Sequence, residues 1–266
     1  NRNFMDLNLN GKNALVCGST QGIGKAAAIE LALLGANVIL MARNEEKLKA
    51  TLAELDHSKG QKHSYISADF TDADTVKKKI ETYLKGHAPI QILVNNTGGP
   101  PAGPALTAPV DEFLQAFNNH LVCNHTLVQA LVPGMKTAKY GRILNVISTS
   151  VKQPIPGLGV SNTIRAAVGN WSKTLATELA PFGITVNNVL PGAANTVRLQ
   201  SIFENKAQKT NKSVEAIKQE MVAEIPAGRI AEPNEVANAI AFLASPAASY
   251  ITGINVPVDG GRTLCL

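Results

Sequence analysis

The sequence predicts an α/β protein built on a single doubly wound sheet of seven mostly parallel strands, with helices on both faces. Short apolar segments rich in β-branched residues alternate with longer amphipathic segments along the whole chain. The apolar segments are almost continuously hydrophobic, as strands buried on both faces are. A glycine-rich turn joins the first apolar segment to the first amphipathic one. The length of 266 residues suits one such domain, which we expect to span residues 1–266.

The expected strands share their short length and continuous apolar character. They are Ala14–Cys17, Asn37–Met41, Lys62–Ala68, Ile90–Asn95, Arg142–Ser148, Thr185–Leu190 and Asn255–Val258. The segments between them have the period of an amphipathic helix. These are Gly22–Leu34, Glu45–Asp56, Asp72–Lys85, Val110–Met135, Asn162–Leu179 and Pro233–Ala244. Because strands and helices alternate, we expect right-handed βαβ units.

Two segments interrupt this alternation. Residues 98–108 (GGPPAGPALTA) are rich in Gly and Pro, which predicts a loop after the fourth strand. Residues 193–225 follow the sixth strand and are expected to form a lid over a substrate. Ligands of open α/β sheets bind beyond the carboxyl ends of the strands, so both segments are predicted to border the site.

Composition and charge exclude several classes of protein. Apolar residues make up 45% of the chain and charged residues 17%, which excludes a disordered chain. The sequence contains no run of about 18 apolar residues, so we expect no membrane-spanning helix. The net charge of +5 is spread along the chain, and its one tight cluster, Lys77–Lys79, is typical of a solvated helix face. We therefore expect neither a nucleic acid nor a membrane as partner.

The cysteines and the N-terminus bear on the compartment. Cys17, Cys123 and Cys265 have neither paired nor metal-ligand spacing, so we expect free thiols, no metal site and a cytoplasmic protein. The first residues have no secretory pattern. Residues 1–4 precede Met5 and are expected to be a remnant that is not native.

The glycine-rich turn predicts a phosphate-binding loop. It consists of Gly18, Ser19, Thr20, Gln21, Gly22, Ile23 and Gly24. Its glycines permit a tight turn, and backbone N–H groups at the start of the following helix can bind a pyrophosphate. The alternative is an ordinary glycine-rich turn without a ligand.

Arg43 favours NADP(H) over NAD(H) as the cofactor. It follows the second strand, where an acidic residue would bind the 2′-hydroxyl of the adenosine ribose and an Arg accommodates a 2′-phosphate. Residues 36–44 contain no Asp or Glu. The alternative is a solvent-exposed Arg beside a helix that Asn44 caps.

Five motifs between Gly11 and Gly261, in the expected order, resemble the short-chain dehydrogenase/reductase (SDR) family, above all its 3-oxoacyl-[acyl-carrier-protein] reductase-like members. They are the G-x-x-x-G-x-G loop, Asp69–Phe70, Asn95–Gly98 (similar to N-N-A-G), Pro191-Gly192-x-x-x-Thr196 and Val258–Gly261 (V-D-G-G). The resemblance implies a Rossmann-type domain with strand order 3-2-1-4-5-6-7. It also implies that the chain binds the cofactor through Asp69, Phe70, Asn96, Gly98, Pro191, Gly192 and Thr196.

Family members commonly assemble through their two long helices. Here these are Val110–Met135 and Asn162–Leu179, and the second contains Ala166, Ala167, Gly169 and Ala176, which permit close approach. A homotetramer is therefore expected, with a dimer as the alternative.

The resemblance also assigns the catalytic positions, and most of them hold unexpected residues. The family uses Asn, Ser, Tyr and Lys. Ser148 occupies the Ser position, Ser161 the Tyr position and Arg165 the Lys position, so that Y-x-x-x-K becomes S-x-x-x-R. The Asn position holds His120, or Asn119 if the register slips by one residue. The four tyrosines, at positions 65, 83, 140 and 250, lie outside residues 151–185.

These replacements predict a modified active site. A serine hydroxyl is shorter and far less acidic than a phenol, and an Arg does not release a proton near neutral pH. We expect Ser148 and Arg165 to bind the substrate oxygen, Arg165 to contact the nicotinamide ribose, and His120 to be the candidate proton donor. The alternatives are a packed His120, an N-capping Ser161 and an ion-paired Arg165. His125 is expected on a helix–helix contact.

Three functions remain open. The favoured one is an NADP(H)-dependent oxidoreductase that acts on a carbonyl or hydroxyl group of a small molecule. A catalytically silent NADP(H)-binding protein and a dehydratase or isomerase are the alternatives. A hydrolase is excluded because no G-x-S-x-G motif surrounds Ser148.

Overall fold

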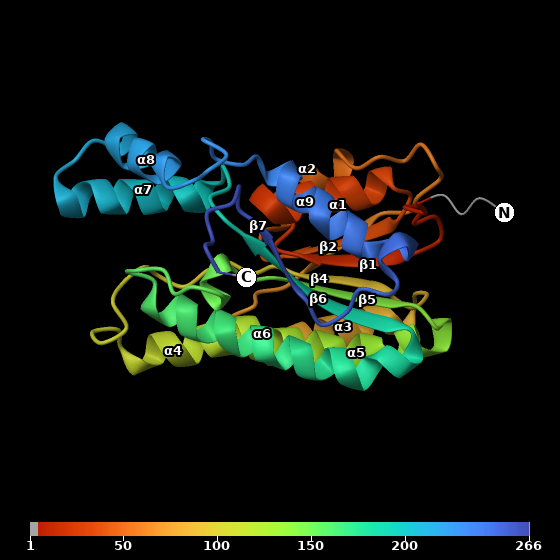
Figure 1. The fold of residues 1–266 in the computed structure, drawn as a ribbon. Helices are drawn as coiled ribbons and strands as arrows, with labels where there is room; N and C mark the ends of the chain where they lie inside the picture. Colours follow the sequence, from red (N-terminus) through yellow and green to blue (C-terminus); the bar gives the residue numbers. More distant parts are fainter. Residues whose placement is uncertain (1–4, 266) are drawn as a thin grey trace.

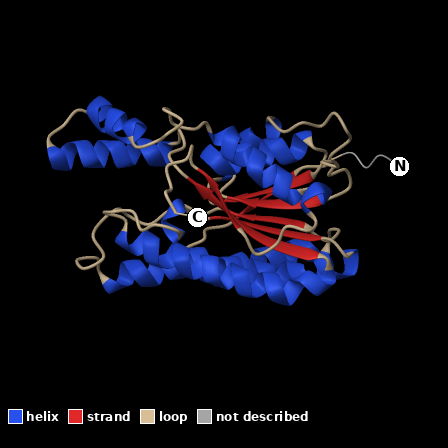
Figure 2. Ribbon diagram, viewed as in Figure 1, coloured by secondary structure: helices blue, strands red, loops and turns tan. Residues whose placement is uncertain are grey.

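A computed structural model describes residues 5–265, so the remnant expected at residues 1–4 lies outside the described part. One seven-stranded sheet lies between two layers of helices (Figures 1 and 2). Its strand order is β3-β2-β1-β4-β5-β6-β7, and every neighbouring pair is parallel. The predicted fold class and strand order are confirmed. Among residues 5–265, no helix is long and apolar enough to span a membrane.

The elements agree with the predicted ones to within a few residues at most ends. The strands are β1 (Asn13–Cys17), β2 (Asn37–Ala42), β3 (Ser64–Ser67), β4 (Ile92–Asn95), β5 (Gly141–Val146), β6 (Ile184–Pro191) and β7 (Asn255–Val258). The helices are α1 (Gly22–Leu33), α2 (Glu45–Ala53), α3 (Ala73–Lys85), α4 (Val110–Phe117), α5 (Cys123–Ala138), α6 (Gly159–Leu179), α7 (Val197–Thr210), α8 (Val214–Ala223) and α9 (Pro233–Ala244).

The helix predicted over Val110–Met135 is interrupted in the structure. A π-helical turn, Asn118–Val122, separates α4 from α5. The apolar period continues through this turn, which is why the sequence pattern does not reveal it. Single π turns inside helices are frequent at functional sites, and this one contains the predicted site residue His120.

Two further boundaries near the site differ from the prediction. Strand β5 ends at Val146 rather than at Ser148, because Ser148 accepts a hydrogen bond from the Ser150 N–H (3.1 Å) and caps the short helical turn Thr149–Val151. Helix α6 begins at Gly159 rather than at Asn162. Ser161 therefore lies inside the first turn of α6, and the prediction that it caps this helix is wrong.

The expectation of right-handed units fails at one crossover. Helices α5 and α6 pack on the sheet face that contains Ile143 and Val186. Helix α9 packs with α1 on the opposite face, against Leu144 and Val189 (Figure 1). Strands β4, β5, β6 and β7 follow one another in the same direction, so the β6–α9–β7 crossover has the opposite hand to its predecessors. This change of face carries residues 192–232 across the carboxyl ends of the strands.

A row of asparagines joins four strands inside the sheet. The side chain of Asn95 donates to Asn145 (2.9 Å), Asn145 donates to Asn188 (3.1 Å), and Asn188 donates to Asn255 (2.8 Å). Each donor and acceptor are direct neighbours in the strand register. Asn145 also donates to Ser172 of α6 (3.2 Å). A slip of any of these strands by one residue would break this row, so it fixes the register of β4, β5, β6 and β7.

The asparagine row gives a stability prediction. Asn145→Ala removes a fully buried amide and leaves the amide nitrogen of Asn95 and the amide oxygen of Asn188 without their partners in the row. We expect the free energy of unfolding to fall by about 2–4 kcal/mol, measured by urea denaturation. The control is Asn238→Ala on the exposed face of α9, which should change stability by less than about 0.5 kcal/mol. Equal effects of both variants would refute a structural role for the row.

Candidate active site

The predicted phosphate loop is held at the point where the strand order reverses, between β1 and β4. Gly18 has a positive φ of 60°, and a Cβ there would lie 2.1 Å from the Asn96 carbonyl oxygen. A Cβ on Gly24 would lie 2.2 Å from the Gly18 carbonyl oxygen. The Asn96 side chain donates to the carbonyl oxygens of Cys17 (3.3 Å) and Gly18 (3.4 Å). Both glycines are therefore required by close approach to Asn96.

The start of α1 is open to an anion. Its N-cap residue, Gln21, makes no side-chain hydrogen bond to the helix, and the first turn contains no acidic residue. The first N–H groups of a helix attract negative charge when no side chain occupies them. Ser19 is fully buried, and its hydroxyl accepts from the Met41 N–H (3.1 Å), so its side chain holds the loop against β2.

The adenosine side of the predicted site lies at the ends of β2 and β3. Arg43 follows β2 directly and is exposed, and the Ser67 hydroxyl donates to its carbonyl oxygen (3.4 Å). No carboxylate among residues 5–265 forms an ion pair with Arg43. Asn44 caps α2 as predicted, accepting from the Lys47 N–H (2.9 Å). The Arg43 guanidinium thus has no acidic partner within the described residues.

Asp69 and Phe70 form the turn after β3. The Asp69 carboxylate accepts from the Thr71 N–H (3.0 Å). The Phe70 ring packs on the core, and its carbonyl oxygen accepts from the Cys123 thiol (3.1 Å). The turn is therefore fixed to the start of α5 at the carboxyl end of β3.

The segment after β6 reaches back to the phosphate loop. A Cβ on Gly22 would lie 3.1 Å from the Thr196 methyl carbon. Thr196 caps α7, its hydroxyl accepting from the Leu199 N–H (3.2 Å). A Cβ on Gly192 would lie 2.6 Å from the Asp259 Cβ, so the V-D-G-G segment packs directly under Pro191–Gly192. Three of the motifs seen in the sequence thus meet at one place.

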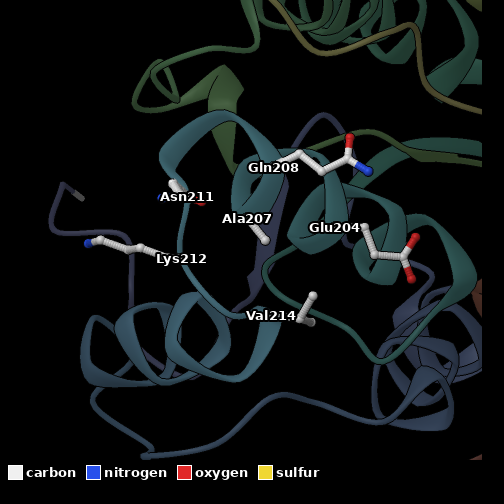
Figure 3. A pocket seen from close by; sticks show the side chains of 6 residues that line it. All are labelled: Glu204, Ala207, Gln208, Asn211, Lys212 and Val214. Carbon is white, nitrogen blue, oxygen red and sulfur yellow. The ribbon is translucent and has the colours of Figure 1, made fainter.

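The predicted lid is a helical hairpin of α7 and α8 that projects beyond the carboxyl ends of the strands (Figure 1). Leu199, Phe203 and Ile217 are buried between the two helices. These three apolar side chains therefore stabilise the hairpin itself. A hollow between these helices is lined by Glu204, Ala207, Gln208, Asn211, Lys212 and Val214 (Figure 3). None of the predicted site residues lines it.

The Gly/Pro-rich loop after β4 docks onto the start of α6. The Gly103 N–H donates to the Gly157 carbonyl (2.7 Å), and the Gly159 N–H donates to the Gly103 carbonyl (2.9 Å). A Cβ on Gly159 would lie 2.3 Å from the Ala105 nitrogen. This docking holds the loop beside the predicted catalytic positions of α6.

Arg165 is the central charged group of the site. It lies on α6 with only 9% of its surface exposed, and its Nη1 donates to the Val146 carbonyl oxygen at the end of β5 (2.9 Å). Burial, together with the charge of Arg198, lowers the pKa of Arg165 to about 10. The guanidinium thus stays protonated at neutral pH. Ser161 lies one turn earlier on the same helix and is half-buried.

His120 faces the same site from the π turn. Its Nδ1 lies 2.6 Å from the Thr97 hydroxyl, and only 2% of the residue is exposed. Burial and then the charge of Arg165 lower the pKa of His120 to about 2. The imidazole is therefore neutral at physiological pH, and it fixes the loop after β4. Asn119, the alternative at this position, hydrogen-bonds with Gln115 instead.

All four tyrosines lie away from this site. The Tyr140 hydroxyl donates to the Ala244 carbonyl (2.7 Å) at the amino end of β5. The Tyr65 hydroxyl donates to Glu45, and that of Tyr83 pairs with Ser64. Tyr250 is fully exposed after α9. The structure therefore brings no phenol to the carboxyl ends of β4 and β5.

Comparison with known proteins gives the family. A family model described as enoyl-(acyl carrier protein) reductase matches residues 18–263. The chain is 34% identical to the 3-oxoacyl-[acyl-carrier-protein] reductase FabG of Haemophilus influenzae, over 96% of this chain and all of the relative. The chain belongs to the short-chain dehydrogenase/reductase family.

Solved structures of SDR-type reductases are similar throughout. L-sorbose reductase from Gluconobacter frateurii, complexed with NADPH and L-sorbose, superposes with a TM-score of 0.92 at 30% identity, covering 98% of this chain and all of the other. YwfH, an NADPH-dependent reductase involved in bacilysin biosynthesis, gives a TM-score of 0.90 at 27% identity, covering 96% of this chain and 99% of the other. An NAD(P)-type cofactor is thus consistent with the fold of this SDR protein.

One charged residue of the site was missed by the sequence analysis. Arg198 is the second residue of α7, and its Nη2 donates to the Pro100 carbonyl oxygen in the loop after β4. Partial burial lowers the pKa of Arg198. The available signal was its position two residues after the predicted cofactor residue Thr196. The orientation of the Arg198 side chain depends on how the α7–α8 hairpin packs against the loop after β4. The sequence pattern does not predict this packing.

Several other expectations from the sequence can be compared with the structure. Cys17, Cys123 and Cys265 are free thiols, as predicted. Lys77–Lys79 are exposed on α3. His125 accepts from the Trp171 ring N–H (3.4 Å) between α5 and α6, which confirms the predicted helix contact. Within residues 5–265, no three His, Cys, Asp or Glu side chains form a group that could bind a metal.

The buried neutral His120 predicts a pH dependence of stability. The folded protein keeps this imidazole neutral down to about pH 2, whereas the unfolded chain takes up a proton below its pKa of about 6.5. The unfolded state therefore binds more protons in acid, so this contribution is complete above about pH 6.5 and falls as the pH decreases. When the pH falls from 7 to 5.5, the free energy of unfolding measured with urea should decrease by about 1 kcal/mol more for the unsubstituted protein than for His120→Gln.

The exposed His87→Gln variant is the matched control for this measurement. It removes an imidazole without changing the buried site, so it should keep the pH dependence of the unsubstituted protein. A His120→Gln variant with the same pH dependence as the unsubstituted protein would contradict a neutral His120.

Proposed function

We propose that this SDR protein is an NADP(H)-dependent reductase that reduces a carbonyl group with a modified active site. In it, the buried cation Arg165 replaces the phenol and amine of the family as the group that stabilises the reacting oxygen. The main support for this proposal is the Arg165 side chain, because it is buried, protonated at neutral pH and hydrogen-bonded to the end of β5. The printed activities of the similar reductases support the reaction class.

The residues at the switch point fit an NADP(H) molecule. The Gly18–Gly24 loop and the uncapped start of α1 would bind the pyrophosphate. Arg43 would bind the 2′-phosphate, and Asp69 and Phe70 would border the adenine. Asn96, Gly98, Pro191, Gly192 and Thr196 would line the nicotinamide half. When bound, NADPH supplies the hydride.

Arg165 and Ser148 would stabilise the negative charge that develops on the substrate oxygen. Ser148 lies two residues beyond Val146, the residue to which Arg165 is anchored. Its hydroxyl accepts from the Ser150 N–H, which leaves its own hydrogen free to donate to the substrate. Preorganised donors of this kind act where charge develops and need no rearrangement during the reaction.

The proton of the alcohol would then come from water. Ser161 has a hydroxyl too short and too weakly acidic to replace a tyrosine phenol. Because His120 is neutral and its Nδ1 lies within hydrogen-bond reach of the Thr97 hydroxyl, we propose that it positions the loop after β4 and is not the acid. This changes the expected role of His120 from donor to positioning residue.

We also propose that residues 1–266 form one domain whose hairpin 193–225 is the substrate lid, and that α4 and α6 pair between subunits. Apolar side chains on α4 support this assembly, because Val110 and Leu114 are 72% and 63% exposed. Ala166 is exposed on α6, whereas Gly169 and Ala176 are buried within the chain. A homotetramer, with a dimer as the alternative, is testable by light scattering.

Cofactor choice can be tested at Arg43. Arg43→Ala should weaken NADPH binding about 10- to 100-fold, because it removes a charge-assisted contact to the 2′-phosphate. NADH, which lacks this phosphate, should bind nearly as before. Fluorescence titration measures both affinities, with the exposed Lys47→Ala on α2 as the charge control. Equal losses for both cofactors would contradict the proposal.

The role of Arg165 can be tested by kinetics. Arg165→Gln and Ser148→Ala should each lower kcat for carbonyl reduction about 10²- to 10³-fold, because each removes a donor to the developing charge. Ser161→Ala should leave kcat close to its original value. The readout is steady-state NADPH oxidation over a panel of ketones. If NADPH binds but no ketone is reduced, the silent cofactor-binding function is favoured instead.

A further inference from the structure

Two arginines from different elements meet at the loop after β4. Arg165 comes from α6 and Arg198 from α7. The Nη2 atom of each lies 3.7 Å from the position that a Cβ on Gly99 would occupy. The two guanidinium groups therefore flank the same glycine, which has no side chain to fill the space beside them.

Neither of these arginines has an acidic partner in the described chain. Arg229 pairs with Glu235 (2.6 Å) and Arg262 pairs with Glu224. No Asp or Glu of residues 5–265 lies within 4.0 Å of the guanidinium nitrogens of Arg165 or Arg198. The site thus holds two neighbouring positive charges, one of them nine-tenths buried, without a compensating charge.

Both guanidinium groups also keep hydrogen-bond donors for a ligand. One nitrogen of Arg165 donates to the Val146 carbonyl, and one of Arg198 donates to the Pro100 carbonyl. Within residues 5–265 these are their only hydrogen bonds. A guanidinium has five N–H groups in a planar fork, so several remain on each side chain. Cations held together in a partly dry site repel each other, and an anion between them would relieve this repulsion.

The phosphates of the cofactor do not account for the charge of this pair, and the nicotinamide ribose expected beside Arg165 is neutral. The pyrophosphate of the cofactor is expected at the Gly18–Gly24 loop, and its 2′-phosphate at Arg43, directly after β2. The arginines face Gly99 and Pro100 instead, in the loop that continues to the start of α6. An anion bound by them would belong to the substrate.

We propose that Arg165 and Arg198 bind a carboxylate adjacent to the carbonyl that is reduced, which makes the substrate a 2-oxo acid. This inference rests on the proposed reductase function. Arg165 can contact both the carboxylate and the reacting oxygen only if the two groups are neighbours in the substrate. Carboxylates also match the planar fork of arginine in a bidentate contact. A neutral ketone would leave the charge of both arginines uncompensated.

Binding of oxamate, an unreactive analogue of a 2-oxo acid, tests the site without turnover. We expect the NADP⁺-loaded protein to bind oxamate by calorimetry, and Arg198→Gln to weaken this binding about 10- to 100-fold. Arg198→Lys should recover part of the loss, because it keeps the charge without the fork. The control is Lys209→Gln, which removes an exposed charge from the same helix and should leave the affinity unchanged. Inorganic phosphate that binds more tightly than oxamate would overturn the choice of a carboxylate.

Steady-state kinetics provide a second test of the proposed 2-oxo acid substrate. We expect kcat/KM for NADPH oxidation to be at least about 10-fold higher with pyruvate or 2-oxobutanoate than with their methyl esters, and Arg198→Gln to abolish this preference. Equal kcat/KM for acids and esters, with no oxamate binding, would overturn the inference while the reductase function stands. If no carbonyl compound is reduced, the reductase function fails, and oxamate binding alone decides whether the anion site exists.

Discussion

The close packing of Asn96 on Gly18 and Gly24 is the constraint on which the site depends. The amide of Asn96 ties the end of β4 to the end of β1, at the one place where the strand order reverses. The phosphate loop and the loop after β4 therefore leave the sheet at a fixed separation. His120 and α6 then hold the second loop, through Thr97 and Gly159 respectively. The sites that we propose for the cofactor pyrophosphate and for the substrate therefore lie on two loops with a fixed separation.

The chemistry of the site follows from its charge. A phenol and an amine can pass a proton along, whereas a buried guanidinium stays protonated and stabilises negative charge where it stands. The neutral imidazole of His120 is compatible with this, because a second proton next to Arg165 would add a further buried charge. In the proposed reaction, electrostatic stabilisation by Arg165 takes the place of proton relay, and Arg198 extends the positive region toward the α7–α8 hairpin.

Much of the fold could be predicted from the sequence, because buried parallel strands are continuously apolar and the glycine loop has a specific spacing. The glycine-rich turn between β1 and α1 and the N-cap Asn44 also follow from local patterns. The π turn around His120 could not, since the helical apolar period continues through it. The opposite hand of the β6–α9–β7 crossover and the role of Arg198 depend on long-range packing. The start of α6 was misplaced because Gly159 is fixed by the distant Gly103.

Label transfer measures most directly whether hydride transfer takes place in this site without a phenol. NADPH deuterated at both C4 positions is incubated with the protein and a carbonyl compound, and the product is examined by mass spectrometry. We expect one deuterium at the carbinol carbon with the unsubstituted protein, and a large loss of labelled product with Arg165→Gln. Labelled product formed equally well by both proteins would contradict the role of Arg165, and bound NADPH that never transfers its label would contradict the reductase function.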